Sequence, residues 1–183
     1  MTATRNAYPR GHNQAVGYVP LRADVETELE VRAWHRGAYG SNFAAMPSSL
    51  VRVIAAVIPR ADTLLVSQRP VHKRHGALFE FPGGKCEPGE SDADAARREL
   101  AEELGVEVIS VGRELFAIAD HGSEFLIAFV PVEIRGEPQC IEHSEHVWGT
   151  LHELAALPLA PGDRRFVEFL IATPAALEAV TNT

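Results

Sequence analysis

The sequence predicts a mixed fold, an α+β or α/β sandwich in which helices cover a sheet. Short β-branched, apolar runs alternate along the chain with two stretches of helical periodicity, and turn residues separate them. The chain has 183 residues, 46% of them hydrophobic and 23% charged, which suits one globular domain of ordinary size with an appendage. This composition excludes extensive disorder.

The strands are predicted from short apolar runs that are rich in Val and Ile. The first run, VRVIAAVI, is followed by a turn at Pro59–Asp62 and by the returning strand of a hairpin. Shorter runs of the same kind follow the first predicted helix. The predicted strands cover residues 51–58, 63–67, 106–111, 115–119, 125–132 and 145–150.

Two helices are predicted, over residues 91–104 and 162–172. The first has Ser91 as its N-cap, acidic residues in its first turn and Gly105 as its C-terminal stop. The tail after Thr173 carries little signal. The residues expected to face inward are Ala93, Ala96, Leu100 and Leu104 in the first helix and Phe166, Phe169 and Leu170 in the second.

Composition divides the chain near residue 49. Residues 1–49 carry a net charge of +1 and are rich in turn-forming residues, whereas the remaining residues carry −9. We therefore expect an N-terminal extension over 1–49 and one domain over 50–183. Met46 is the one methionine besides Met1, so two hypotheses stand: the native start is Met46, or residues 1–49 form a genuine arm that packs on the domain or a partner.

Charge and cysteine content exclude several classes of protein. The net charge of −8 argues against a broad electrostatic grip on nucleic acid. No apolar run approaches about 18 residues, so no membrane span is expected, and the start lacks the pattern of a secretory signal. Two cysteines, Cys86 and Cys140, make no disulfide framework. A reducing, cytoplasmic setting is the simplest interpretation.

Three glutamates mark the first predicted helix. Glu99, Glu102 and Glu103 fall at i, i+3 and i+4, which places them on one face. One interpretation is a solvated acidic face, balanced by Arg97 and Arg98. The other is a site for a hard cation such as Mg²⁺ or Mn²⁺, which prefers oxygen ligands and can share them with phosphate.

The segment around these glutamates resembles the Nudix box, G-x5-E-x7-R-E-U-x-E-E-x-G-U, where U is aliphatic. Upstream, the stretches SQRP and LFEFPGGK resemble the MutT branch of that family, with Phe79 in place of the usual Trp and Cys86 in place of Val or Ile. The resemblance covers about residues 51–171. The matching box residues are Gly84, Glu90, Arg98, Glu99, Leu100, Glu102, Glu103, Gly105 and Val106.

The resemblance implies a Nudix α/β/α sandwich with a mixed sheet and a Mg²⁺-dependent enzyme, with Mn²⁺ as an alternative metal. It implies hydrolysis of a nucleoside triphosphate, normal or oxidised, to monophosphate and pyrophosphate by attack of water on phosphorus. Hydrolysis of an ADP-sugar or dinucleotide polyphosphate is the alternative, and a non-catalytic nucleotide sensor is the alternative of another class. The expected partner is a small nucleotide, and the expected state is a monomer or homodimer.

By the same resemblance, Glu99, Glu102 and Glu103 ligate the metal, helped by the carbonyl of Gly83. Glu90 orients these ligands or contacts metal-bound water. Arg98 is expected to pair with a box glutamate and hold its rotamer, with a solvated surface role as the alternative.

The remaining candidates lie outside the box. Arg69 and Lys85 are candidates for phosphate contact or plain surface charges. A general base is expected at Glu142, with Glu145 as the fallback. The other candidates each have a structural alternative: Asp163 reads the base edge or caps a helix, Phe81 lines the base pocket or packs in the core, and His143 and His146 tune pH dependence or lie on the surface.

Overall fold

The computed structural model describes residues 50–73, 75–119 and 123–181. The predictions for residues 1–49, including the alternative start at Met46, lie outside the described residues. Within the described part, strands and helices alternate much as the sequence predicts. The elements are β1 (Val51–Val57), β2 (Pro59–Arg60), β3 (Thr63–Gln68), β4 (Phe79–Glu80), α2 (Asp92–Leu104), β5 (Glu107–Val111), β6 (Phe116–Ile118), β7 (Phe125–Arg135), β8 (Glu145–Gly149), α3 (Leu151–Ala156), α4 (Pro161–Ala172) and α5 (Pro174–Thr181).

The strands form two sheets with parallel and antiparallel pairs. In the first, β1 lies parallel to β7, and the long strand β7 pairs antiparallel with β5 and β6. In the second, β3 pairs antiparallel with β2, β4 and β8. The mixed sheet that the sequence predicts is confirmed.

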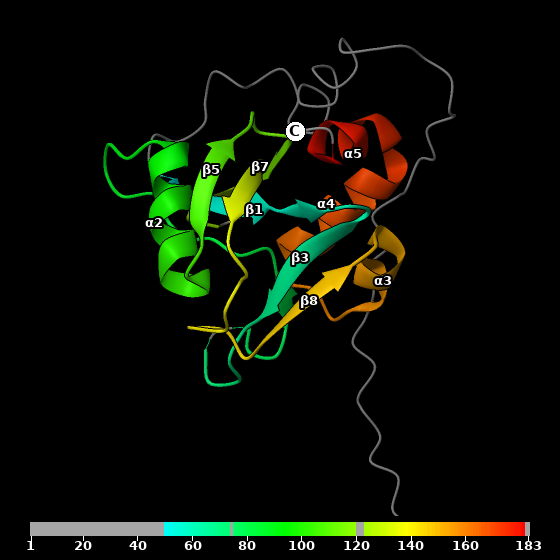
Figure 1. Cartoon of the computed structure of the whole chain (residues 1–183), viewed down its shortest axis with the longest axis horizontal. Helices are drawn as coiled ribbons and strands as arrows, with labels where there is room; N and C mark the ends of the chain where they lie inside the picture. Colours follow the sequence, from blue (N-terminus) through cyan, green and yellow to red (C-terminus); the bar gives the residue numbers. More distant parts are fainter. Residues whose placement is uncertain (1–49, 74, 120–122, 182–183) are drawn as a thin grey trace, which may run out of the picture. The chain divides into compact units, whose positions relative to one another are not determined.

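Alternation along the strands produces a core on each face. In β1, Ile54 and Ala56 pack toward α2, while Ala55 and Val57 pack toward α3, α4 and α5. Figure 1 shows the same division, with α2 beside β5 on one side and α4 and α5 on the other. Helices therefore cover both faces, which confirms the α/β/α sandwich.

The helix α2 follows the predicted pattern closely. The Ser91 side chain accepts a hydrogen bond from the Asp94 N–H at 3.2 Å, and Gly105 ends the helix in the left-handed conformation. Its buried residues are Ala95, Ala96, Leu100 and Leu104, so Ala95 replaces Ala93 in the expected stripe.

Four elements are missing from the sequence prediction: β2, β4, α3 and α5. The strand β2 occupies the first half of the turn predicted at Pro59–Asp62 and pairs with β3. The strand β4 has two residues and forms by pairing with β3 and by a bridge to Leu159, contacts that local pattern does not reveal. The helix α3 carries a capping box between Thr150 and Glu153, a recognisable signal in its sequence. No helix among the described residues is long and apolar enough to cross a membrane.

Candidate active site

Residues 82–84, called the glycine segment below, run along the free edge of β1 and face α2. The N–H groups of Ile54 and Ala56 donate to the carbonyls of Gly84 and Pro82, each at 2.8 Å. Gly83 has φ +143°, and a Cβ there would collide with the Ile54 carbonyl. A Cβ on Gly84 would collide with the Glu99 carboxylate. Both glycines are needed because the backbone passes so close to β1 and to α2, the helix that carries the box glutamates.

Glu103 is a partly buried carboxylate of the box. Its Oε2 accepts a hydrogen bond from the Gly83 N–H at 2.9 Å, which joins the end of α2 to the glycine segment. Burial raises the pKa of Glu103 to about 7, with nearby Glu80 and Glu99 adding to the rise, while His143 and the Gly83 hydrogen bond oppose it. A cation beside Glu103 would relieve this unfavourable burial of negative charge.

Arg98 binds box glutamates on both sides, as predicted. Its Nε and Nη2 donate to the two oxygens of Glu90 at 3.0 and 2.9 Å, and its Nη1 donates to Glu99 Oε1 at 2.7 Å. Its Nη2 also reaches the Lys85 carbonyl at 2.9 Å. The guanidinium lowers the pKa of Glu90. Arg98 therefore fixes the rotamer of Glu99 while Glu90 fixes that of Arg98.

The metal that the family resemblance implies is compatible with these residues. Glu99, Glu102 and Glu103 offer only carboxylate oxygens, the donors that Mg²⁺ prefers. The absence of any Cβ at Gly84 leaves the Glu99 carboxylate its space against the backbone. Across residues 50–73, 75–119 and 123–181, however, no three His, Cys, Asp or Glu side chains are arranged as a finished metal site. Glu99 and Glu103 are instead held by Arg98 and by the Gly83 N–H.

A second polar group lies beside Glu103, and sequence reasoning missed Glu80, the residue that joins its members. Glu80, on β4, binds Arg69 Nη1 at 2.6 and 2.9 Å and His143 Nε2 at 3.3 Å. Glu80 occurs within the LFEFPGGK stretch, and that placement is the one signal for it in the sequence. The surface interpretation of His143 is wrong, because its side chain is only 4% exposed. His146 is also partly buried, against Ser67.

Asp163 is buried at the start of α4. Its Oδ1 accepts from the Phe81 N–H at 2.8 Å, and burial raises its pKa to about 7 against the effect of that hydrogen bond. The helix-cap interpretation is wrong, because α4 begins at Pro161 with Ala160 as its N-cap and no side-chain cap bond. Pro161 can open the helix because its missing N–H would have no partner there.

The remaining candidates have three different environments in the structure. Phe81 is a core residue, with its ring edge-on to those of Phe129 and Phe166 at centroid distances of 5.8 and 5.3 Å. The Lys85 ammonium lies 4.8 Å from the centroid of the Phe125 ring. Glu142 is exposed and pairs with Lys73 at 2.9 Å.

The loop that carries Glu142 nevertheless meets the box helix. The Ile141 N–H donates to the Glu103 carbonyl at 3.3 Å, and the Gln139 N–H donates to the Leu104 carbonyl at 2.9 Å. Glu142 therefore directly follows Ile141, whose backbone is hydrogen-bonded to the C-terminal end of α2. Glu145 is the first residue of β8, opposite Gln68 of β3.

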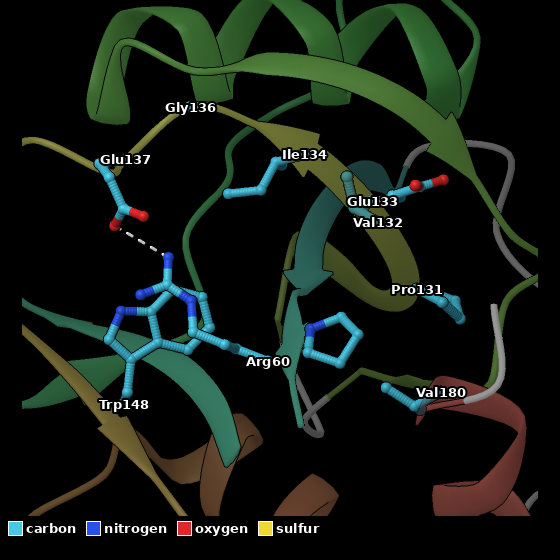
Figure 2. A pocket seen from close by; sticks show the side chains of 10 residues that line it. Arg60, Pro131, Val132, Glu133, Ile134, Gly136, Glu137, Trp148 and Val180 are labelled. Carbon is cyan, nitrogen blue, oxygen red and sulfur yellow. Dashed lines mark hydrogen bonds and ion pairs between the residues drawn. The ribbon is translucent and has the colours of Figure 1, made fainter. Parts of the chain in front are cut away.

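A separate pocket of about 390 Å³ contains none of these candidates. The guanidinium of Arg60 lies 3.9 Å from the centre of the Trp148 ring and binds Glu137 at 2.9 Å, as Figure 2 shows. The other walls of the pocket come mainly from the end of β7 (Figure 2). None of the box carboxylates lines this pocket.

Comparison with known proteins shows the family of this chain. The NUDIX domain model matches residues 49–170. The CTP pyrophosphohydrolase of Escherichia coli is 38% identical over 136 residues, which cover 71% of this chain and 98% of the relative. A putative 8-oxo-dGTP diphosphatase 2 of Mycobacterium tuberculosis is 38% identical over 124 residues, 66% of this chain and 88% of the relative.

The solution structure of the E. coli ORF135 protein is similar in fold. Its TM-score is 0.60 with 37% identity, and the match covers 70% of this chain and 93% of that one. The match to the NUDIX domain model contains the box, the glycine segment and most of α4. The chain therefore belongs to the Nudix family of hydrolases.

Proposed function

We propose that this Nudix hydrolase converts a nucleoside triphosphate to the monophosphate and pyrophosphate in a Mg²⁺-dependent reaction. The observation that carries the proposal is the position of Glu99 and Glu103, which α2 holds against the Gly83–Gly84 segment. The printed names of two relatives, a CTP pyrophosphohydrolase and a putative 8-oxo-dGTP diphosphatase, support a triphosphate as the substrate.

In this proposal Glu99, Glu102, Glu103 and the Gly83 carbonyl hold Mg²⁺, or Mn²⁺ in its place. Bound there, the ion would neutralise phosphate charge and make an attacking water more acidic. Glu90 and Arg98 keep Glu99 oriented through their paired hydrogen bonds. Arg69 and Lys85 contact the phosphates.

We assign the general base to Glu142, which is next to the residue bound to the end of α2. Its ion pair with Lys73 is exposed, so the contact costs little to break when an anionic substrate competes for the lysine. Glu142→Gln should lower kcat by about a hundredfold, since a positioned base contributes roughly 10²–10⁴. Glu145→Gln is the matched control and should retain kcat. The reverse result would move the base to Glu145.

We assign base recognition to Asp163. With its pKa near 7, this carboxyl can donate or accept a hydrogen bond at neutral pH, and the Phe81 N–H fixes one of its oxygens. Phe81 itself contributes by packing, because its ring is buried among aromatic residues. Asp163→Asn should therefore change the ranking of bases more than the rate with the best one.

The proposal is tested by a turnover screen with Mg²⁺ across normal and oxidised nucleoside triphosphates, ADP-ribose and dinucleoside polyphosphates. Monophosphate and pyrophosphate from a triphosphate are the expected products. Preference for ADP-ribose or a dinucleotide would retain the Nudix chemistry and reject the triphosphate. Tight binding of a nucleotide without turnover would show a sensor, and in that case Glu103→Gln would leave the nucleotide affinity intact.

A further inference from the structure

His143 lies in the loop between β7 and β8, and its imidazole is almost completely buried. Its Nε2 is 3.3 Å from Glu80 Oε1, and the Glu80 carboxylate binds Arg69 Nη1 through both oxygens, at 2.6 and 2.9 Å. These contacts form one polar chain from His143 through Glu80 to Arg69, in which His143 lies far in sequence from the other two. Arg69 is the more accessible end of this chain, with 29% of its side chain exposed against 4% for His143.

The sheet register holds this chain in place. Ser67 of β3 is directly opposite Glu80 on β4 and opposite His146 on β8, so the three side chains point to the same face. The Ser67 hydroxyl is 2.9 Å from His146 Nδ1, and the His146 and His143 rings have centroids 6.1 Å apart. Glu80 is therefore paired with β3, a strand that β8 also pairs.

The proton on His143 can be assigned from its partner. The Glu80 carboxylate faces the Arg69 guanidinium and acts as an acceptor, so His143 Nε2 carries the hydrogen and donates it. Nδ1 is the second polar atom of the ring, an acceptor when the ring is neutral and a donor when it is protonated. It is buried, and among the residues that the structure describes it has no hydrogen-bond partner. A buried polar atom without a hydrogen-bond partner lowers stability, and an apolar side chain of similar size would avoid that cost.

The Glu80–Arg69 pair also occupies a particular place in the site. Glu80 and His143 are electrostatic neighbours of Glu103, and Glu80 and Arg69 are electrostatic neighbours of Asp163. The pair thus lies near both the box carboxylate proposed for the metal and the carboxyl proposed for the base. A nucleotide that extends from one to the other would pass Arg69.

We propose that His143 is a positioning residue for the substrate, because its hydrogen bond fixes Glu80 and thereby holds the Arg69 guanidinium in place for the nucleotide phosphates. The inference rests on the proposed function. A polar group retained at a cost in stability is typical of a functional position. His143 accordingly affects nucleotide affinity more than the chemical step.

The test compares His143→Leu, which removes the donor, with His143→Gln, whose amide NH₂ can replace the Nε2–H. The measurements are the Kd of a non-hydrolysable α,β-methylene triphosphate with Mg²⁺, KM, kcat and Tm. For His143→Leu we expect Kd and KM to rise by about tenfold, with kcat nearly unchanged and Tm equal or higher. His143→Gln should recover most of the affinity. His152→Gln, on the exposed face of α3, is the matched control and should match the unmodified protein.

A double-mutant cycle with Arg69→Ala supplies the deciding readout. If His143 acts through Arg69, His143→Leu should not weaken binding further when Arg69 is already replaced. His143→Asn, whose amide is on a shorter side chain, is the comparison for His143→Gln. The proposal would be overturned by an unchanged Kd in His143→Leu, by additive losses in the cycle, or by a Kd of His143→Gln no lower than that of His143→Asn. If the Leu variant does not fold, the Gln and Asn variants decide. Failure of the proposed function would appear separately, in the products that the unmodified protein makes.

Discussion

Glu103 connects the buried end of α2 to the glycine segment, and its protonation is expected to control metal binding. Its pKa is raised to about 7 by burial, so at lower pH a cation must displace a proton to bind. The apparent Mg²⁺ affinity should therefore increase as the pH rises toward about 7 and level off above it.

Glu103→Gln tests this directly. Gln keeps an oxygen for the Gly83 N–H but has no charge, so the fold should persist while turnover falls by about a hundredfold or more. Mg²⁺ titrations between pH 5.5 and 8.5, values chosen to bracket that pKa, should show a weak affinity that no longer depends on pH. Pronounced pH dependence that survives in the Gln variant would assign the titrating group elsewhere.

Asp163 makes a prediction about stability. Its folded pKa of about 7 lies above the ordinary value of about 3.9 that the unfolded chain would show. Between these values the folded protein retains a proton that the unfolded chain releases, so this group's contribution to the free energy of unfolding falls as the pH rises from about 4 to about 7.

Asp163→Asn removes the titration while keeping an oxygen for the Phe81 N–H. Urea unfolding of both proteins at several pH values in this window should show the free energy of unfolding of the Asp protein declining relative to that of the Asn protein. A difference that is constant with pH would contradict the raised pKa. Glu103 titrates in both proteins, so its contribution cancels in the comparison.

At the scale of elements, substitutions of the two glycines in the segment beside β1 should have different effects on stability and activity. Gly83→Ala places a Cβ against the backbone carbonyl of Ile54 at a positive φ, so we expect a loss of more than about 1 kcal/mol in the free energy of unfolding. Gly84→Ala meets first the side-chain carboxylate of Glu99 and not a backbone atom, so stability should change by less than about 1 kcal/mol while kcat falls sharply.

Urea midpoints and kcat for the two variants make the comparison. The Gly84 variant should unfold like the original protein and hydrolyse poorly, because the added Cβ displaces the Glu99 carboxylate. Full activity in that variant would mean that Glu99 tolerates displacement and is not a ligand.

Local signals explain which elements the sequence could predict. Ser91, Gly105 and the i, i+3, i+4 glutamates lie within one helix, so its bounds and its acidic face were readable from the residues alone. The burial of His143 and the position of Glu80 depend on pairing between β3, β4 and β8, which are far apart in sequence. Asp163 looked like a helix cap because its neighbours suit one, yet Pro161 starts the helix two residues earlier.

For the whole molecule, every candidate site residue lies between Arg69 and Asp163, and the family match covers residues 49–170. A protein that begins at Met46 should therefore fold and retain the kcat/KM of the full chain. Parallel assays of the two proteins, with circular dichroism as the folding control, make the measurement. A folded but inactive short protein would show that residues 1–45 contribute to the reaction.

Hydrolysis in ¹⁸O-labelled water with Mg²⁺, followed by mass analysis of the products, tests the central claim most directly. The proposed function predicts nucleoside monophosphate and pyrophosphate from a triphosphate, with one ¹⁸O atom in one of the two products, and no turnover without a divalent metal. Release of orthophosphate, preferential cleavage of ADP-ribose, or tight binding without any product would contradict it.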